Sequence, residues 1–281
     1  MLAVVHHRLS HSAALNVVAS QLGALDMQLQ EELANCGVLT VQLDREAELW
    51  IGVDQRMRPS KSTTSFKILV VMEPPDVQRI CTDGFDLVLT WQSAHLESLP
   101  NARLFVPAAP WLVAAEWPRF HGPAKRRGLG FLRGAKRRTE GHRLRHRVWD
   151  AREELAGAMR VPPDFLAGGV GRGERNRQFG CQFVLVIENS RHANYFTEKL
   201  LDALLARCVP VYWGCANLAE FFDPGGVIEA GGTPEEVLET CRRLTEGDYA
   251  RRADALDRNF ESAKRYAGDF GRRLQHAIEG R

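Results

Sequence analysis

The chain has no long apolar segment. None of its runs approaches the roughly 20 apolar residues that a membrane-spanning helix needs, so we expect no membrane span. The apolar start, MLAVVHHRLSHS, has no basic region before it and is interrupted by two histidines, which argues against a signal peptide. We therefore expect a cytoplasmic protein.

The chain also has no closely spaced cysteines. Its six cysteines lie far apart, and no pair has the C-x-x-C spacing of a zinc site or a redox motif. In a protein without an export signal such cysteines are most simply buried thiols. They are Cys36, Cys81, Cys181, Cys208, Cys215 and Cys241.

Internal repeats and low-complexity tracts are absent as well. Hydrophobic residues make up 44% and charged residues 26% of the chain, values that are ordinary for a soluble globular enzyme. The length of 281 residues fits two domains with separate cores.

Positive charge is concentrated in one segment. Between Pro118 and Trp149 there are eleven Lys or Arg residues and a single acid, Glu140, although the net charge of the whole chain is only +2. Such a block predicts contact with an anion: nucleic acid, an anionic surface or a phosphorylated small molecule.

Short β-rich runs alternate with helical patterns along the chain. This alternation predicts an α/β fold with parallel sheets covered on both faces. In the first part we expect a helix over 12–37 and strands at VLTVQL, FKILVVMEPP and FDLVLTW. The change of composition before the basic segment places the domain boundary there, giving domains 1–115 and 116–281, the second with the C-terminal helices.

The second half repeats the pattern. Expected strands are GLGFLRG, FVLVIEN, VPVYWG and GVIEA, and expected helices are EGHRLRHRVWDAREELAGAM, FTEKLLDALLAR and a short ANLAEFF. In TPEEVLETCRRL, Thr233 is an N-cap candidate, Pro234 fits the first helical position, and Glu236 completes a capping box. The remaining tail is amphipathic and helical, and we expect it to pack across the domains.

Polar residues follow the strand FVLVIEN. In open parallel sheets the carboxyl ends of the strands form the ligand crevice, and a helix amino terminus favours phosphate. The residues at this strand end and at the start of the next helix are Glu188, Asn189, Ser190, Tyr195, Glu198 and Lys199. Taken singly they also fit turn formers and solvated surface charges, but together they predict an anion site.

The segment ENSRHANYFTEKLLDALLARCVPVYWG resembles the donor-binding motif of the α-1,3-fucosyltransferases of glycosyltransferase family 10. In that motif a glutamate, an asparagine and a serine precede a tyrosine, a Thr-Glu-Lys, a helix and a Val-Pro-Val strand. The resemblance is strong over 183–228 and fainter upstream. The matching residues are Glu188, Asn189, Ser190, Tyr195, Thr197, Glu198, Lys199, Val209, Pro210, Val211 and Gly214.

The resemblance implies a GT-B fold, with two Rossmann-like domains. GDP-fucose would be held mainly by the C-terminal domain and the acceptor, a glycan or glycoconjugate, mainly by the other. It also implies inversion by single displacement, with an arginine for the donor diphosphate in LRGAKRRTEGHRLRHRVW; Arg145 is the first candidate and Lys136 the second. Arginine and lysine could stabilise the charge that builds up on the departing diphosphate.

No metal or other cofactor is expected. Glycosyltransferases of the other main fold usually hold a divalent cation with an Asp-x-Asp pair, and this sequence contains no D-x-D. Positive side chains would then take the place of the metal.

The sequence departs from the family pattern at two places. Asn194 stands where the family commonly has aspartate before the motif tyrosine. Where we look for the acidic general base, after FDLVLTW, the chain has Gln92 and Ser93. His95 and Glu73 are the remaining base candidates and rank equally.

Three alternatives stay open. The first is a GT-B glycosyltransferase that uses another nucleotide sugar, and the second is a non-catalytic protein that binds nucleotide sugars. The third, a nucleic-acid binder, is disfavoured because the basic block lacks a nucleic-acid motif and has an apolar helix side. We expect the partners to be a nucleotide sugar and a glycan acceptor rather than nucleic acid, and a peripheral membrane contact stays open.

Overall fold

The computed structural model describes residues 2–7, 38–42, 49–54, 58, 66–122, 125–168, 171–268 and 270–280. The helix predicted over 12–37, and Cys36 with it, lie outside these residues. The chain divides into two compact units, Met1–Ala109 with Gly268–Arg281, and Pro110–Ala267. The first unit ends at Ala109, before the predicted domain boundary at 115. The C-terminal residues from Gly268 onwards also belong to the first unit, not to the second as predicted.

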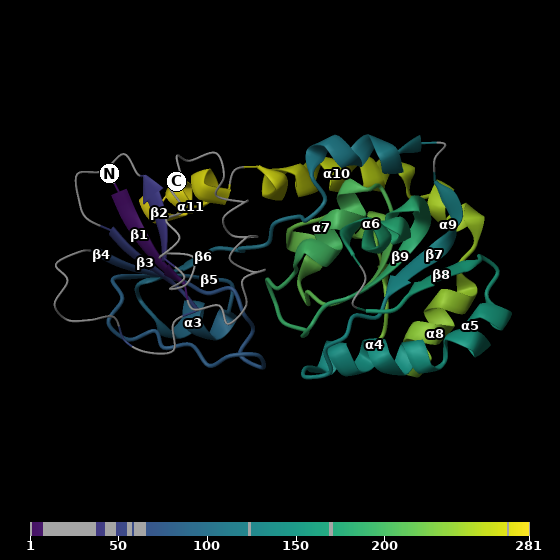
Figure 1. The fold of residues 1–281 in the computed structure, drawn as a ribbon, viewed down its shortest axis with the longest axis horizontal. Coiled ribbons are helices and arrows are strands. Elements are labelled where there is room, and N and C mark those ends of the chain that lie inside the picture. The colour runs from purple at the N-terminus through teal and green to yellow at the C-terminus, as the bar shows by residue number, and fades with distance from the viewer. Residues whose placement is uncertain are drawn as a thin grey trace. The chain divides into compact units, whose positions relative to one another are not determined.

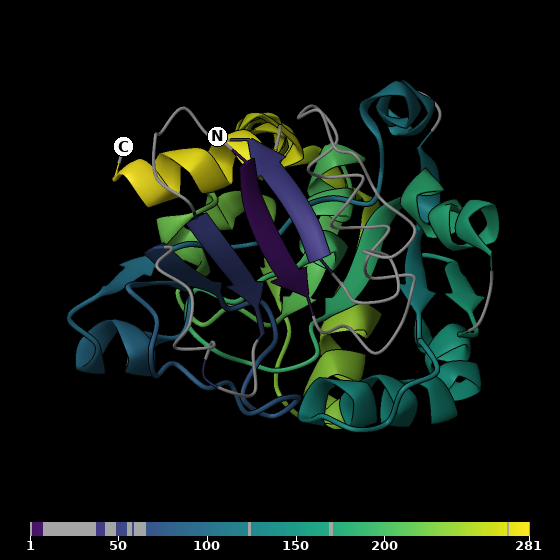
Figure 2. The same cartoon turned by 60° about the vertical axis from the view of Figure 1, so that its left-hand side comes forward.

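The first unit contains a six-stranded sheet in the order β2-β1-β3-β4-β5-β6 (Figure 2). Its strands are β1 (Leu2–His7), β2 (Val38–Gln42), β3 (Leu49–Val53), β4 (Phe66–Val70), β5 (Leu87–Thr90) and β6 (Ala102–Leu104). All neighbours pair in parallel except β1 and β2. The predicted parallel sheet is thus present, with one antiparallel strand added at its edge, as is common in α/β sheets.

Within the described part of this unit lie two helices, α3 (Ser93–Ser98) and α11 (Phe270–Glu279). Helix α11 is fixed to the first unit by Arg273, whose guanidinium donates hydrogen bonds to the carbonyl oxygens of Val106 at 2.6 Å and Ala108 at 2.8 Å. Phe270 packs edge-on against Phe105 with the ring centroids 5.8 Å apart. These contacts explain why the chain end belongs with the first sheet.

The second unit contains a five-stranded sheet in the order β11-β10-β9-β7-β8, with every pair parallel (Figure 1). Its strands are β7 (Arg126–Leu132), β8 (Pro163–Leu166), β9 (Cys181–Ile187), β10 (Val209–Trp213) and β11 (Ile228–Glu229). The parallel α/β prediction is confirmed here, and the runs GLGFLRG, FVLVIEN, VPVYWG and GVIEA all contain the strands expected of them.

Helices cover both faces of the second sheet (Figure 1). On one side lie α4 (Glu140–Asp150), α5 (Arg152–Ala158) and α8 (Pro234–Arg243), and on the other α7 (Glu198–Leu205) and α10 (Ala253–Ala267). The shorter elements are η1 (Ala114–Phe120), α6 (Arg172–Asn176), η3 (Arg177–Gly180), η4 (Leu218–Glu220), η5 (Pro224–Gly226) and α9 (Glu246–Ala250).

Local sequence explains most helix boundaries. In α8 the predicted capping box is present, with Thr233 accepting from the Glu236 N–H and the Glu236 carboxylate accepting from the Thr233 N–H. The single helix predicted from 140 to 159 is wrong, because Ala151, with φ −91° and ψ 10°, ends α4 and begins α5. The expected helix in ANLAEFF is the single 3₁₀ turn η4.

The core of the second unit is built from the apolar faces of these elements. It includes Leu129, Phe131, Phe183, Val209 and Trp213. Cys181, Cys208, Cys215 and Cys241 are buried free thiols, as predicted, and Cys81 is half-buried. Among the residues described, no helix combines the length and the apolar character that a membrane crossing requires.

Candidate functional site

The candidate site begins where β9 ends, at Glu188. This residue is completely buried, and its backbone N–H continues the sheet by donating to the Trp213 carbonyl at 2.9 Å. Its carboxylate accepts the Thr197 N–H at 2.8 Å and the Thr197 hydroxyl at 2.6 Å. Burial raises the pKa of Glu188, and Lys199 opposes that rise. Glu188 therefore ties the strand end to the N-cap of α7.

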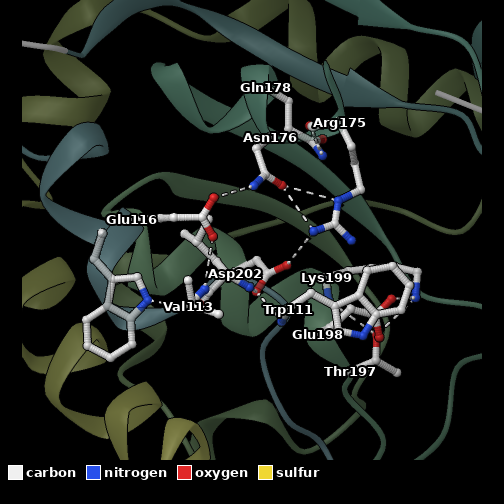
Figure 3. Close-up of polar contacts among 12 residues, drawn as sticks. Trp111, Val113, Glu116, Arg175, Asn176, Gln178, Thr197, Glu198, Lys199 and Asp202 are labelled. Atoms are coloured by element: carbon white, nitrogen blue, oxygen red, sulfur yellow. Dashed lines mark hydrogen bonds and ion pairs between the residues drawn. The ribbon is translucent and has the colours of Figure 1, made fainter. Parts of the chain in front are cut away.

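Lys199 lies in the first turn of α7 between the carboxylates of Glu198 and Glu188. Figure 3 shows it beside Thr197 and Glu198. Its Nζ lies 2.8 Å from Oε1 of Glu198, 3.0 Å from the Thr197 hydroxyl and 3.7 Å from Oε2 of Glu188. Burial works against its charge, but Glu198 and Glu188 outweigh burial and raise the pKa of Lys199. The ammonium is therefore held charged, with a quarter of the side chain accessible to a ligand.

Arg145, on α4, is only 6% exposed. Its Nη2 donates to Oδ1 of Asn189 at 2.8 Å, while the buried Nε has no hydrogen-bond partner and no carboxylate of a described residue lies within 4.0 Å of the guanidinium. Burial lowers the pKa of Arg145, and the carboxylates of Glu188 and Glu198, which lie beyond 4.0 Å, oppose that shift. A buried guanidinium with no carboxylate in contact is costly, so this arrangement fits a site that an anion completes.

Close packing brings Arg145 to this position. The Gly141 N–H donates to the Asn189 carbonyl at 3.0 Å, and a Cβ at Gly141 would collide with the Glu188 carbonyl oxygen. Only glycine lets the first turn of α4 approach the end of β9 so closely. The sequence analysis did not single out Gly141.

Ser190 is buried at the same strand end, with 1% of its surface exposed. Its hydroxyl has no partner among the described residues. A buried hydroxyl normally finds a hydrogen bond, so the missing partner is consistent with a ligand. Arg145 contacts Asn189 and Lys199 contacts Glu188, with Ser190 at the same strand end. That these residues bind a donor stays a prediction.

The loop between Ser190 and α7 is held by a pair of amides. Asn194 has φ +61°, a left-handed backbone that asparagine and aspartate tolerate best after glycine. Its N–H donates to Oδ1 of Asn217 at 2.7 Å, and its own Oδ1 accepts from Nδ2 of Asn217 at 2.8 Å. The neighbouring Tyr195 is buried with its ring 6.3 Å from that of His192.

Lys136 lies apart from this cluster. Its side chain is exposed in the loop before α4, and its backbone carbonyl lies 3.2 Å from Nε2 of His146. Lys136 is one of four nearby basic groups that, together with burial as the largest cause, lower the pKa of His142 to about 3.

Sequence reasoning missed a polar network behind α7 (Figure 3). Asp202, 2% exposed, accepts the N–H groups of Trp111 and Leu112, both at 2.8 Å. Its other oxygen lies 3.9 Å from Arg175, which stacks over the Trp111 ring at 4.5 Å. The sequence does contain one indication of this network, because Asp202 is an acid on the apolar face of the helix in TEKLLDALL.

The base candidates lie in the first unit. Glu73 follows β4, where its N–H donates to the carboxylate of the buried Asp54 at 3.2 Å and its carbonyl accepts from Gln92 at 3.1 Å. Burial raises the pKa of Asp54 to about 7. His95, on α3, has Nδ1 3.3 Å from the Thr90 hydroxyl, and burial lowers its pKa. Both candidates therefore contact Gln92, whose side-chain amide donates to the Glu73 carbonyl and whose own carbonyl accepts the His95 N–H at 3.0 Å; Glu73 also contacts Asp54.

A comparison with protein families identifies the segment that carries the second-unit site. Residues 173–249 match the model for glycosyltransferase family 10 (fucosyltransferase), C-terminal part. This segment is similar to glycosyltransferase family 10. The resemblance inferred from the motif is thereby confirmed.

Two fucosyltransferases are similar over part of the chain. An α-(1,4)-fucosyltransferase of Arabidopsis thaliana is 38% identical over 71 residues, which are 25% of this chain and 18% of that protein. An α-(1,3)-fucosyltransferase of Helicobacter pylori is 40% identical over 47 residues, 17% of this chain and 10% of that protein. The matches thus span less than a fifth of either relative.

Solved α1,3-fucosyltransferase structures show the fold over most of the chain. One matches with a TM-score of 0.51 and 14% identity, covering 84% of this chain and 79% of that one. Another, solved with GDP-fucose, matches with a TM-score of 0.50 and 15% identity, covering 83% and 79%. The fold is GT-B, as the motif implied.

Proposed function

We propose that this protein is an inverting, metal-independent glycosyltransferase that moves fucose from GDP-fucose to a hydroxyl of a glycan or glycoconjugate. The observation that carries the proposal is the buried guanidinium of Arg145, which has no carboxylate of a described residue in contact and binds Asn189 of the segment that matches family 10 and contains Lys199. Both cations lie beside a strand end and helix starts, where a diphosphate is favoured.

The two cations would share the work of leaving-group stabilisation. Arg145 offers a planar fork for two phosphate oxygens, and Lys199 offers a compact charge. Because both are held in place before the donor binds, they can stabilise the charge that develops on GDP as the sugar leaves. With no D-x-D in the sequence, these side chains would replace a metal.

Glu73 is the base that we propose for the acceptor hydroxyl. Asp54 and Gln92 fix its backbone on both sides, so its carboxylate starts from a defined position at the strand ends. A base must lie within hydrogen-bond reach of the proton it removes, which requires such positioning. His95 stays the alternative, with one ring nitrogen turned to Thr90.

The transferase proposal is tested by turnover in EDTA. Purified protein is incubated with GDP-fucose and an array of glycan acceptors, and fucosylated product is measured against donor hydrolysis. We expect transfer that persists with the chelator. Loss of transfer on chelation, restored by Mg²⁺ or Mn²⁺, would contradict metal independence. Transfer from another GDP-sugar but not from GDP-fucose would establish the alternative donor.

The base assignment has its own test. We expect Glu73→Gln to lower kcat by about 10²-fold or more while GDP affinity is unchanged, since general-base catalysis contributes on that order. His95→Ala should leave kcat within about threefold. If His95→Ala abolishes turnover and Glu73→Gln does not, the two roles are reversed.

A further inference from the structure

Helix α4 begins with an unusual capping box, in which histidine occupies the third helical position. The N–H of the N-cap residue, Thr139, donates to Nδ1 of His142 at 3.1 Å, and the Thr139 hydroxyl lies 2.6 Å from the same nitrogen. The His142 N–H returns a contact to the Thr139 hydroxyl at 3.5 Å. Since Nδ1 accepts a backbone N–H, it carries the lone pair, and the ring proton is on Nε2.

The ring of His142 is held neutral. Burial is the largest cause, and the positive charges of Arg145, Lys199, Lys136 and His146 act in the same direction, so the pKa is about 3. At neutral pH the imidazole is therefore a fixed tautomer with one N–H donor.

That donor is unused. No hydrogen bond joins Nε2 of His142 to any described residue, although the side chain is only 5% exposed. His142 and Arg145 are three residues apart, so they lie on the same side of α4. The same helical turn contacts the Glu188–Asn189 strand end through Gly141. The free N–H thus belongs to the turn of α4 that lies beside the site cations.

The choice of histidine has a physical reason if an anion binds there. The third position of a capping box is usually Glu or Gln. A glutamate would close the cap equally well, but its negative charge would lie beside Arg145 and would oppose a diphosphate. A neutral imidazole satisfies the N-cap and still presents a donor on its far side.

We propose that His142 is a donor-binding residue that gives a hydrogen bond from Nε2–H to a phosphate oxygen of the nucleotide-sugar diphosphate. The proposal rests on the proposed function, because it requires the diphosphate at this site. It assigns a second task to a residue whose ring otherwise only caps a helix.

The test separates capping from binding. GDP and inorganic pyrophosphate are titrated calorimetrically into wild type, His142→Gln, His142→Glu and Thr139→Val, and the unfolding temperature is recorded for each. Gln and Glu keep an oxygen acceptor for the Thr139 N–H, so both variants should keep the wild-type unfolding temperature. Thr139→Val removes the cap hydroxyl but leaves the backbone N–H that fixes the tautomer, so it should unfold earlier.

We expect GDP affinity to follow the N–H donor and not stability. His142→Glu, which keeps the cap acceptor but has no donor, should bind GDP at least roughly tenfold more weakly than wild type. His142→Gln, whose amide nitrogen can still donate, should bind GDP more tightly than His142→Glu, and Thr139→Val should stay within about twofold of wild type. GDP affinity that is unchanged in both His142 variants, or that falls only in Thr139→Val, would overturn the inference. Absence of GDP and pyrophosphate binding in wild type would instead overturn the donor site and the inference together.

A measurement on the wild-type protein complements the variants. The ¹⁵N signals of the His142 ring should report the Nε2–H tautomer before ligand is added, and the Nε2–H proton should shift downfield when GDP binds. A ring signal that GDP leaves unmoved would contradict the hydrogen bond.

Discussion

At the scale of single residues, the left-handed backbone of Asn194 gives a prediction for the donor loop. Both Asn194→Ala and Asn194→Gly lose the side-chain bond from Nδ2 of Asn217 and keep the backbone N–H bond to its Oδ1, but only alanine is strained at φ +61°. We expect the alanine variant to be less stable than the glycine variant by about 1 kcal/mol. Chemical denaturation measures the difference; equal stabilities would show that the left-handed backbone is not retained.

Asp202 gives a prediction for pH dependence at the same scale. Burial raises its pKa from 3.8 to about 7, so between these values the folded protein binds more protons at this group than the unfolded chain does. The free energy of unfolding that protonated Asp202 contributes is therefore fully present below about pH 4 and is lost as the pH rises towards 7. Asp202→Asn keeps an oxygen for the Trp111 and Leu112 N–H groups without this proton linkage.

We therefore expect the stability of Asp202→Asn, relative to wild type, to increase from pH 5 to pH 7 and to level off above pH 7. Urea unfolding at several pH values measures this difference. Asp54, in the first unit, titrates over the same window in both proteins, so it cancels in the comparison. Parallel stability profiles would contradict a raised pKa for Asp202.

At the scale of elements, the approach of α4 to β9 depends on one missing side chain. Gly141→Ala places a methyl group against the Glu188 carbonyl, so we expect a loss of about 1–3 kcal/mol and weaker GDP binding as Arg145 moves. Gly157→Ala, in α5, is the matched control, because nothing lies within 4 Å of its Cβ. It should gain about 0.4–1 kcal/mol. Similar effects of both changes would refute the close packing.

Some of the helices and strands could be predicted from the sequence, and others could not. The strand before Glu188, the helix that begins near Lys199 and the capping box of Thr233 and Glu236 are local patterns, and all were predictable. The break at Ala151 has no proline or glycine to signal it. The antiparallel pairing of β2 depends on long-range contacts that a local pattern does not contain.

The same distinction applies to the site. Glu188, Asn189, Ser190 and Lys199 are contiguous with one motif, and the resemblance was enough to find them. Arg145 was chosen by its place between Leu144 and an aromatic region, whereas its lack of a contacting carboxylate among the described residues is visible only in three dimensions. The positions of Asp54 and Asp202 beside their backbone partners depend on tertiary structure, so neither was selected.

At the scale of the whole molecule, both chain ends contribute to the first unit. Arg273→Ala removes hydrogen bonds to Val106 and Ala108, and we expect it to destabilise that unit by about 1–3 kcal/mol. Hydrogen exchange should accelerate in peptides of the first unit, while peptides of 110–267 keep their protection. His276→Ala, an exposed change on the same helix, is the control. Equal acceleration in both units would contradict the division.

The central claim is a guanine-diphosphate site at Arg145 and Lys199, and a thermal-shift panel tests it most directly. GDP, GDP-fucose, GDP-mannose, UDP and CDP are compared with wild type, Lys199→Ala and the surface control Lys264→Ala, whose lysine pairs with Glu261. A ligand at about 100 times its dissociation constant adds roughly 2.7 kcal/mol of stability. We predict stabilisation by the guanine diphosphates, kept in Lys264→Ala and lost in Lys199→Ala. Stabilisation by none of them, or a shift that Lys199→Ala leaves unchanged, would contradict the account.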